Sequence, residues 1–145
     1  MVNKIKRMIR KTTTSILRDL GFDLFYVSYV IVDDERMRRL NREFRKINRT
    51  TDVLSFPQYK FLNGDLLEPV LFVKEKLPLG DIVISLETIE RRSRCKRDFE
   101  GYLLKAVIHG ILHLLGFDHK SDKDRKVMRG KEGLLYKIYR RGFSI

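Results

Sequence analysis

The chain has three histidines, and all of them lie in one short segment, HGILHLLGFDH, residues 109–119. His109 and His113 are four residues apart, so on an α-helix their imidazoles stand about 40° apart around the axis and about 6 Å apart along it. Both rings can therefore reach one metal ion. Gly116 readily adopts the left-handed conformation and lets the backbone turn, so that His119 can return to the same ion.

Three neutral imidazole nitrogens leave one open position on a tetrahedral zinc ion, which is typical of catalytic zinc sites. A lone histidine in an apolar helix is more often a hydrogen-bonded core residue, but two imidazoles on one face among leucines and isoleucines would each need polar partners. The segment therefore predicts one zinc ion per chain, held by His109, His113 and His119. Nickel, copper and iron also bind imidazole, so other transition metals are possible.

Asp118 could orient one of these imidazoles by hydrogen-bonding to its other ring nitrogen, or it could cap the turn.

The histidines and the glycine have the offsets of H-E-x-x-H-x-x-G-x-x-H, the zinc-binding sequence of metzincin peptidases. In those enzymes the glutamate takes a proton from water, and this chain has Gly110 at that position. A peptidase would need a carboxylate from elsewhere, so a zincin-like metallopeptidase is the alternative hypothesis.

Composition limits the partners and the compartment. With 31 Lys and Arg against 19 Asp and Glu, the net charge is +12, which favours polyanions such as nucleic acid. No apolar run is long enough to cross a membrane, and the single cysteine, Cys95, excludes an internal disulfide and gives no sign of a disulfide-linked partner. We expect one cytoplasmic domain over residues 1–145.

The histidine segment needs a scaffold that holds it. Residues 98–115 have so wide an apolar face that they predict a buried central helix. Capping residues and apolar spacing predict further helices over 3–20, 35–47, 86–96 and 121–140. Strands are expected at 22–32, 51–56 and 80–85. The stretch 58–79 is interpreted as a protruding hairpin or a mobile lid, because Asn63-Gly64 is a hairpin turn signal. In the second helix Met37, Leu40 and Phe44 are expected to face inward. Tyr26, Tyr29 and Phe56 could stack on bases but are expected in the core.

Three blocks of the sequence resemble the YbeY family of bacterial single-strand-specific endoribonucleases. HGILHLLGFDH is similar to that family's H-G-x-L-H-L-x-G-[YF]-D-H signature. LNREFRKINRTTDVLSFP, residues 40–57, resembles L-N-x-x-[YF]-R followed by T-[DN]-V-L-S-F-P, and GDIVIS resembles G-D-[IL]-x-I. The stretch 58–79 and a helical start, in place of the family's usual first strand, depart from the pattern.

The resemblance implies an α+β fold, a small mixed sheet packed with helices around a metal-bearing helix, as in zincins. It implies zinc on the three histidines and an active-site role for Arg45, whose guanidinium can hold a phosphodiester and neutralise charge in the transition state. It also implies single-stranded RNA as substrate, a part in small-subunit (16S) ribosomal RNA maturation and quality control, and the ribosome or its small subunit as a partner.

Other charged residues are weaker candidates. Arg42 and Arg49 could bind phosphates along an RNA backbone. Asp81 could hydrogen-bond to a metal ligand, or it could cap a turn. A metal-stabilised ribosome-assembly factor that binds RNA without cutting it is a second alternative.

Overall fold

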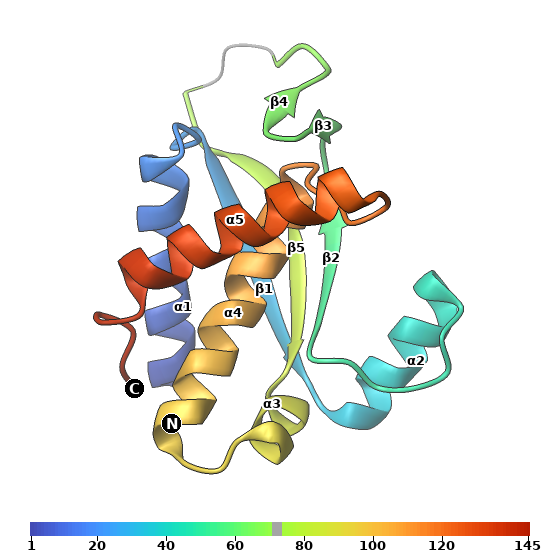
Figure 1. Ribbon diagram of the computed structural model, residues 1–145, viewed down its shortest axis with the longest axis vertical. Coiled ribbons are helices and arrows are strands. Elements are labelled where there is room, and N and C mark those ends of the chain that lie inside the picture. Colours follow the sequence, from blue (N-terminus) through green and yellow to red (C-terminus); the bar gives the residue numbers. More distant parts are fainter. Residues whose placement is uncertain (71–73) are drawn as a thin grey trace.

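Helices cover one face of a small three-stranded sheet, and a two-stranded hairpin stands at one end of the molecule (Figure 1). The computed structural model describes residues 1–70 and 74–145. In chain order the elements are α1 (Val2–Asp19), β1 (Phe25–Val32), α2 (Asp34–Arg45), β2 (Val53–Pro57), β3 (Phe61–Leu62), β4 (Asp65–Leu66), β5 (Leu77–Ser85), α3 (Leu86–Arg92), α4 (Lys96–Leu114) and α5 (Asp122–Tyr139). The expected α+β fold is confirmed.

The sheet has the order β1-β5-β2, with β1 parallel and β2 antiparallel to the central strand β5. Side chains alternate between its two faces. Ile82 of β5 points toward α4 and is fully buried, whereas Val83 joins a smaller apolar cluster with Met37 of α2. The predicted mixed sheet is therefore present, with α4 on one face and α2 against part of the other.

Helix α4 is the central helix, as its wide apolar face predicts. Its buried apolar residues belong to the main core together with residues of α1, α5 and the sheet. In Figure 1, α4 lies beside α1 on the same face of the sheet, and α5 crosses α4. Among the described residues no helix is both long and apolar enough to span a membrane.

Three element boundaries differ by three or more residues from the sequence-based expectation, and one of them is the start of β1, which lies at Phe25 and not at residue 22. Helix α3 ends at Arg92, because Ser93 takes an extended conformation while its Oγ donates to the carbonyl of Ile89 at 2.7 Å. Strand β5 starts at Leu77, earlier than GDIVIS suggested, and pairs there with Phe25. Parallel pairing with β1 thus extends the strand beyond its recognisable motif.

Within the stretch 58–79, β3 and β4 form the hairpin that Asn63-Gly64 predicts, with positive φ at both turn residues. The turn does not project freely, since the Gly64 N–H donates to the carbonyl of Leu115 at 2.8 Å. Residues 71–73 of the expected lid lie outside the described residues.

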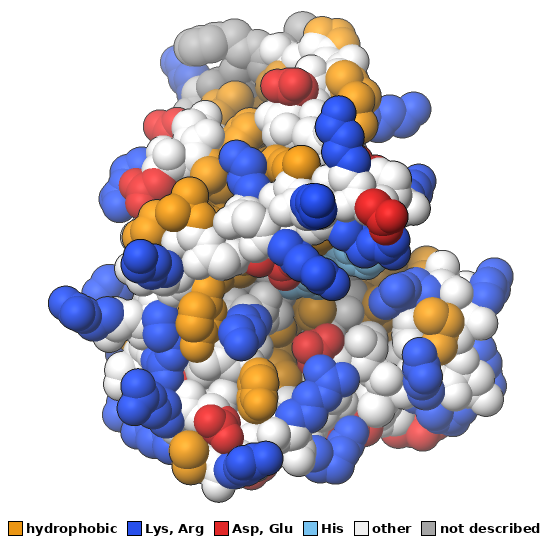
Figure 2. All heavy atoms as spheres, in the orientation of Figure 1, with side chains coloured by type: hydrophobic (Ala, Val, Ile, Leu, Met, Phe, Trp, Pro, Cys, Tyr) orange, Lys and Arg blue, Asp and Glu red, His pale blue; other side chains and the backbone are white. Residues whose placement is uncertain are grey.

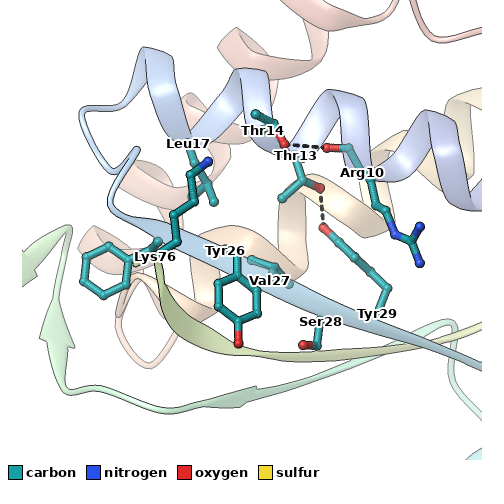
Figure 3. A pocket seen from close by; sticks show the side chains of 10 residues that line it. Arg10, Thr13, Thr14, Leu17, Tyr26, Val27, Ser28, Tyr29 and Lys76 are labelled. Atoms are coloured by element: carbon teal, nitrogen blue, oxygen red, sulfur yellow. Dashed lines mark hydrogen bonds between the residues drawn. The ribbon is translucent and has the colours of Figure 1, made fainter. Parts of the chain in front are cut away.

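A cavity of about 420 Å³ lies between α1 and the edge strand β1 (Figure 3). At its wall the hydroxyls of Thr13 and Tyr29 are 2.6 Å apart, which ties the helix to the strand. Tyr26 lines the same cavity and is 44% exposed, so its expected place in the core is wrong. The ring of Tyr26 points away from α1, whereas that of Tyr29 points toward it (Figure 3).

Candidate metal centre and active-site cleft

The end of α4 brings the third histidine back to the first two. Gly116 has φ +85°, and its N–H donates to the backbone carbonyl of His113 at 3.0 Å. The Phe117 N–H donates to the backbone carbonyl of Leu112, also at 3.0 Å. This pair of hydrogen bonds is a Schellman motif, in which a left-handed residue reverses the chain just after a helix. A Cβ at Gly116 would lie 2.2 Å from the carbonyl oxygen of Phe61, so no other residue fits there. The predicted turn is confirmed.

The three imidazoles meet at one point. One ligand nitrogen from each of His109, His113 and His119 lies within 4.8 Å of the other two. The Nε2 atoms of His109 and His113 are 3.0 Å apart, close to the separation of about 3.3 Å between two nitrogens of a tetrahedral zinc site. Figure 2 shows the histidines as a small pale-blue area below α5, set among basic side chains. The cluster could hold a metal ion.

Glu132 of α5 is hydrogen-bonded to one histidine of this cluster. Its Oε2 lies 3.0 Å from Nδ1 of His109, and that hydrogen bond is the main reason why the pKa of Glu132 is lowered. An ionised carboxylate only accepts, so Nδ1 of His109 carries the proton and Nε2 keeps its lone pair facing the other histidines.

The protonation state of His113 also suits metal binding. Burial, followed by the charges of His109 and His119, lowers the pKa of His113 to about 4. A neutral imidazole has a lone pair to give to a metal, whereas a protonated one must first lose its proton. At neutral pH no proton has to leave this ring.

Replacing Glu132 should weaken metal binding. We expect Glu132→Ala to lower zinc affinity about 10–100-fold, the range typical when a carboxylate that accepts the N–H of a histidine ligand is removed. Glu132→Gln should lose less, because an amide oxygen can still accept the His109 N–H. Competition with a chromogenic chelator measures the affinity. Glu90→Gln removes an exposed carboxylate from α3 and is the matched control; equal affinities for all three proteins would contradict the role of Glu132.

A cleft of about 480 Å³ opens in front of the histidines. Its lining residues come from the end of α2, strand β2, the end of α4 and the following turn: Phe44, Arg45, Val53, Leu54, Ser55, Phe56, Pro57, His109, His113, Asp118 and His119. Arg38 and Arg39 of α2 pair with Glu35, whereas Arg45 has no ion-pair or hydrogen-bond partner among the described residues. Its guanidinium is therefore available to an anion in the cleft.

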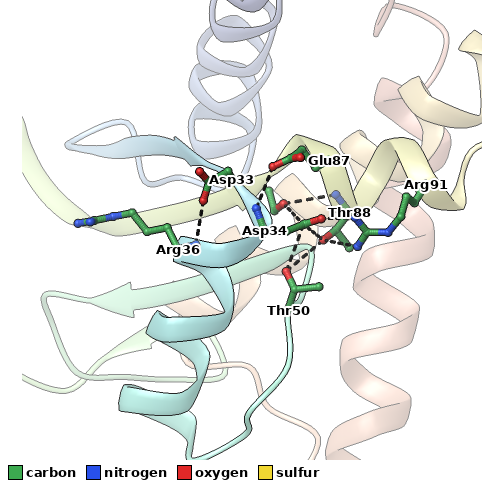
Figure 4. A network of polar contacts seen from close by, with 8 residues as sticks. Asp33, Asp34, Arg36, Thr50, Glu87, Thr88 and Arg91 are labelled. Atoms are coloured by element: carbon green, nitrogen blue, oxygen red, sulfur yellow. Dashed lines mark hydrogen bonds and ion pairs between the residues drawn. The ribbon is translucent and has the colours of Figure 1, made fainter.

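The start of α2 is fixed by a polar network around Asp34 (Figure 4). Oδ1 of Asp34 accepts from Ser85 at 2.8 Å and Thr88 at 2.6 Å, and Arg91 pairs with Oδ2. Burial on its own raises the pKa of this carboxyl, but the hydrogen bonds from Arg91, Thr88 and Ser85 outweigh it and lower the pKa to about 2. The network joins the helix that carries Arg45 to α3.

Asp34→Asn should destabilise the protein at neutral pH by about 1–3 kcal/mol, since it removes charged hydrogen bonds. A lowered carboxyl pKa stabilises above the unfolded value and is lost as pH falls through the folded value. Here that window runs from the ordinary pKa of 3.8 down to about 2. Denaturant unfolding should thus show the gap between wild type and Asp34→Asn closing between about pH 4 and 2. A gap that stays constant in acid would contradict this account.

The end of α2 is held by Asn41, the asparagine of the L-N-x-x-[YF]-R motif. Asn41 is buried, and its Nδ2 donates to the carbonyl of Arg49 at 2.9 Å. Lys46 then ends the helix in the left-handed conformation. The motif therefore fixes the direction in which the chain leaves Arg45.

The other candidate residues are placed as follows. Asp118 lines the cleft, and its Oδ1 accepts the backbone N–H of His119 at 2.7 Å, which holds the turn. Asp81 is exposed on β5 and points away from α4, because Ile82 beside it faces that helix. Arg42 and Arg49 are exposed and do not line the cleft.

Gly110 has no space for the glutamate of a metzincin. A Cβ there would lie 2.9 Å from Cδ1 of Ile82 and 3.3 Å from Oγ of Ser55. Ser55 also donates to the Gly110 carbonyl at 3.2 Å, so α4 packs directly on the sheet. A larger side chain at this position would force Ile82 and Ser55 to shift, and the chain carries no carboxylate there.

Sequence reasoning missed two residues at the site. Glu132 is one carboxylate among several in α5, and nothing in its spacing connects it with the histidines. Phe44 fits the apolar period of α2 with Met37 and Leu40, which predicted an inward side chain, yet it is 55% exposed in the cleft. Its predicted orientation is wrong because the end of α2 extends beyond the sheet (Figure 1).

Comparisons with known proteins agree with these features. A family model described as "Endoribonuclease YbeY" matches residues 1–140. A protein named Endoribonuclease YbeY from Caldicellulosiruptor bescii is 45% identical over 129 residues, 88% of this chain and 80% of that protein. One of the same name from Caldicellulosiruptor saccharolyticus is 39% identical over 133 residues, 90% of this chain and 84% of its own. A solution structure from Thermotoga maritima superposes with a TM-score of 0.57 at 26% identity, covering 97% of this chain and 87% of that one.

Proposed function

Because the chain belongs to the YbeY family of endoribonucleases, we propose that it is a metal-dependent hydrolase that cuts internal phosphodiester bonds of single-stranded RNA. One observation carries the proposal: three convergent imidazoles and the free guanidinium of Arg45 line the same cleft. A metal-binding group beside an anion-binding group is what cleavage of a phosphodiester requires.

We propose that His109, His113 and His119 hold one zinc ion per chain. The all-nitrogen donor set, the 3.0 Å separation of two of its atoms and the low pKa of His113 support zinc, while nickel, copper and iron also accept imidazole. When bound, the ion supplies Lewis-acid chemistry to a phosphate oxygen or to water. The surrounding residues orient these ligands: Glu132 fixes the tautomer of His109, and Asp118 fixes the backbone of His119.

The proposed role of Arg45 is to bind the scissile phosphate. A guanidinium offers paired N–H donors that match two phosphate oxygens, and its charge offsets the negative charge that grows in the transition state. Arg42 and Arg49 are exposed outside the cleft and are proposed to contact the RNA backbone farther along. Asp81 points to the face of the sheet opposite α4, so we assign it no role in the reaction.

We propose ribosomal RNA of the small subunit as the natural substrate, and hence the cytoplasm as the site of action and the ribosome as a partner. The net charge of +12 supports a polyanionic substrate of this kind. Binding through phosphates should weaken steeply as salt is raised.

Metal removal tests the proposal. Zinc-loaded protein should cleave a labelled, unstructured RNA, a chelator should stop the reaction, and added zinc should restore it. The same RNA in a duplex should resist, and casein should stay intact in a parallel reaction. Cleavage that ignores the chelator, or that persists in the His113→Ala protein, would come from a contaminating nuclease and would contradict the proposal. Tight RNA binding without cleavage would instead favour a non-catalytic assembly factor.

A further inference from the structure

An exposed aromatic ring stands in the cleft beside Arg45. Phe44 precedes Arg45 at the end of α2, is 55% exposed, and lines the same cleft as the three histidines. Scattered exposed apolar residues are ordinary on protein surfaces. This one differs because it shares a concave surface with the candidate metal and phosphate ligands.

The ring of Phe44 is held in place although it is exposed. It packs against Phe56 of β2 with ring centroids 5.0 Å apart and an interplanar angle of 75°. Such an edge-to-face pair is a favourable aromatic contact, and it leaves more than half of the Phe44 side chain to solvent. Asn41 and Lys46 fix the backbone on either side, as described above. The ring is therefore positioned before any ligand arrives.

The chemistry around Phe44 suits one kind of ligand. Arg45 is next to it in the chain, Arg42 lies on the same helix, and no carboxylate of α2 lines the cleft. Proteins that bind single-stranded nucleic acid combine cations for the backbone with aromatic rings for the bases. A peptide would offer neither the phosphate for Arg45 nor a planar base for the ring.

Building on the function proposed above, we propose that Phe44 stacks on the base of a nucleotide that adjoins the scissile phosphate, while Arg45 holds that phosphate. In a duplex each base is stacked between its neighbours and has no free face to offer. The cleft would therefore accept single strands and exclude duplexes. Stacking uses a face that all bases possess, so Phe44 gives affinity with little preference among the four bases.

Substitutions at Phe44 test the stacking. Phe44→Leu keeps an apolar contact with Phe56 but removes the aromatic face, and we expect it to raise KM for unstructured RNA about tenfold with kcat nearly unchanged. Phe44→Trp should restore a KM close to that of wild type. Thermal unfolding should place both variants near wild type. A KM of Phe44→Leu equal to that of wild type would overturn the inference.

Abasic RNA separates stacking from a structural effect. Oligonucleotides that lack one base on either side of the cleavage site should lose affinity for wild type at one position, and Phe44→Leu should be insensitive to that same loss. If the loss of affinity from a missing base and the loss from Phe44→Leu multiply at every position of the RNA, no base contacts Phe44 and the inference fails. Wild-type cleavage that stops with the chelator shows that the proposed function itself holds, so failure of one is distinguishable from failure of the other.

Discussion

Replacing His113 with alanine should abolish cleavage of unstructured RNA, with a loss of about 10³-fold or more, and should lower bound zinc well below one ion per chain. His113 is the central member of the histidine cluster, because its Nε2 lies 3.0 Å from that of His109 and its ring centroid lies 5.0 Å from that of His119. Two imidazoles alone bind zinc far more weakly than three. Elemental analysis and a single-turnover cleavage assay measure both effects.

The control for His113→Ala is a substitution in the same helix outside the cleft. Lys96→Ala changes an exposed residue at the start of α4 and should keep full zinc content and activity. Circular dichroism should show that both proteins are folded, since α4 is anchored by apolar residues that neither change touches. Full cleavage by His113→Ala would refute the metal site as the catalytic centre.

The sequence was sufficient for most of the fold because its local signals agree with its packing. Asp33, Ser85 and Ser121 belong to the residue types that favour helix starts, and the side chain of each accepts a backbone N–H there. Gly116 is the expected reversal after α4. The early start of β5 could not be predicted from its own residues, because it depends on pairing with β1, a segment far away in the sequence.

The candidate site was predictable only where its residues are close in sequence. The spacing of the three histidines indicated a shared ion, and the structure brings their nitrogens together. Arg45 looked like any other arginine on a basic helix, and only the resemblance of its motif distinguished it. Glu132 and Phe44 reach the site through tertiary packing of α5 and α2, which periodicity within one helix cannot describe.

Replacing Arg45 with alanine should lower kcat for RNA cleavage by about 10²–10³-fold, the loss typical when one charge-stabilising donor is removed from a transition state. Arg45→Lys should recover only part of it, since an ammonium group cannot bind two phosphate oxygens as a planar fork. Zinc content should stay at one ion per chain in both proteins, because Arg45 makes no hydrogen bond to a histidine in the described structure. Steady-state kinetics and elemental analysis measure these effects.

The contrast with Arg42 and Arg49 decides whether Arg45 has a distinct role. Arg42→Ala and Arg49→Ala remove the same charge from exposed positions outside the cleft. They should raise KM modestly, leave kcat unchanged and reduce the slope of log affinity against log salt by about one each. Arg45→Ala should instead act mainly on kcat, because a contact that strengthens in the transition state lowers the barrier and not merely ground-state binding. If all three variants raise KM equally and leave kcat alone, Arg45 is one phosphate contact among many and the chemistry depends on the histidine cluster alone.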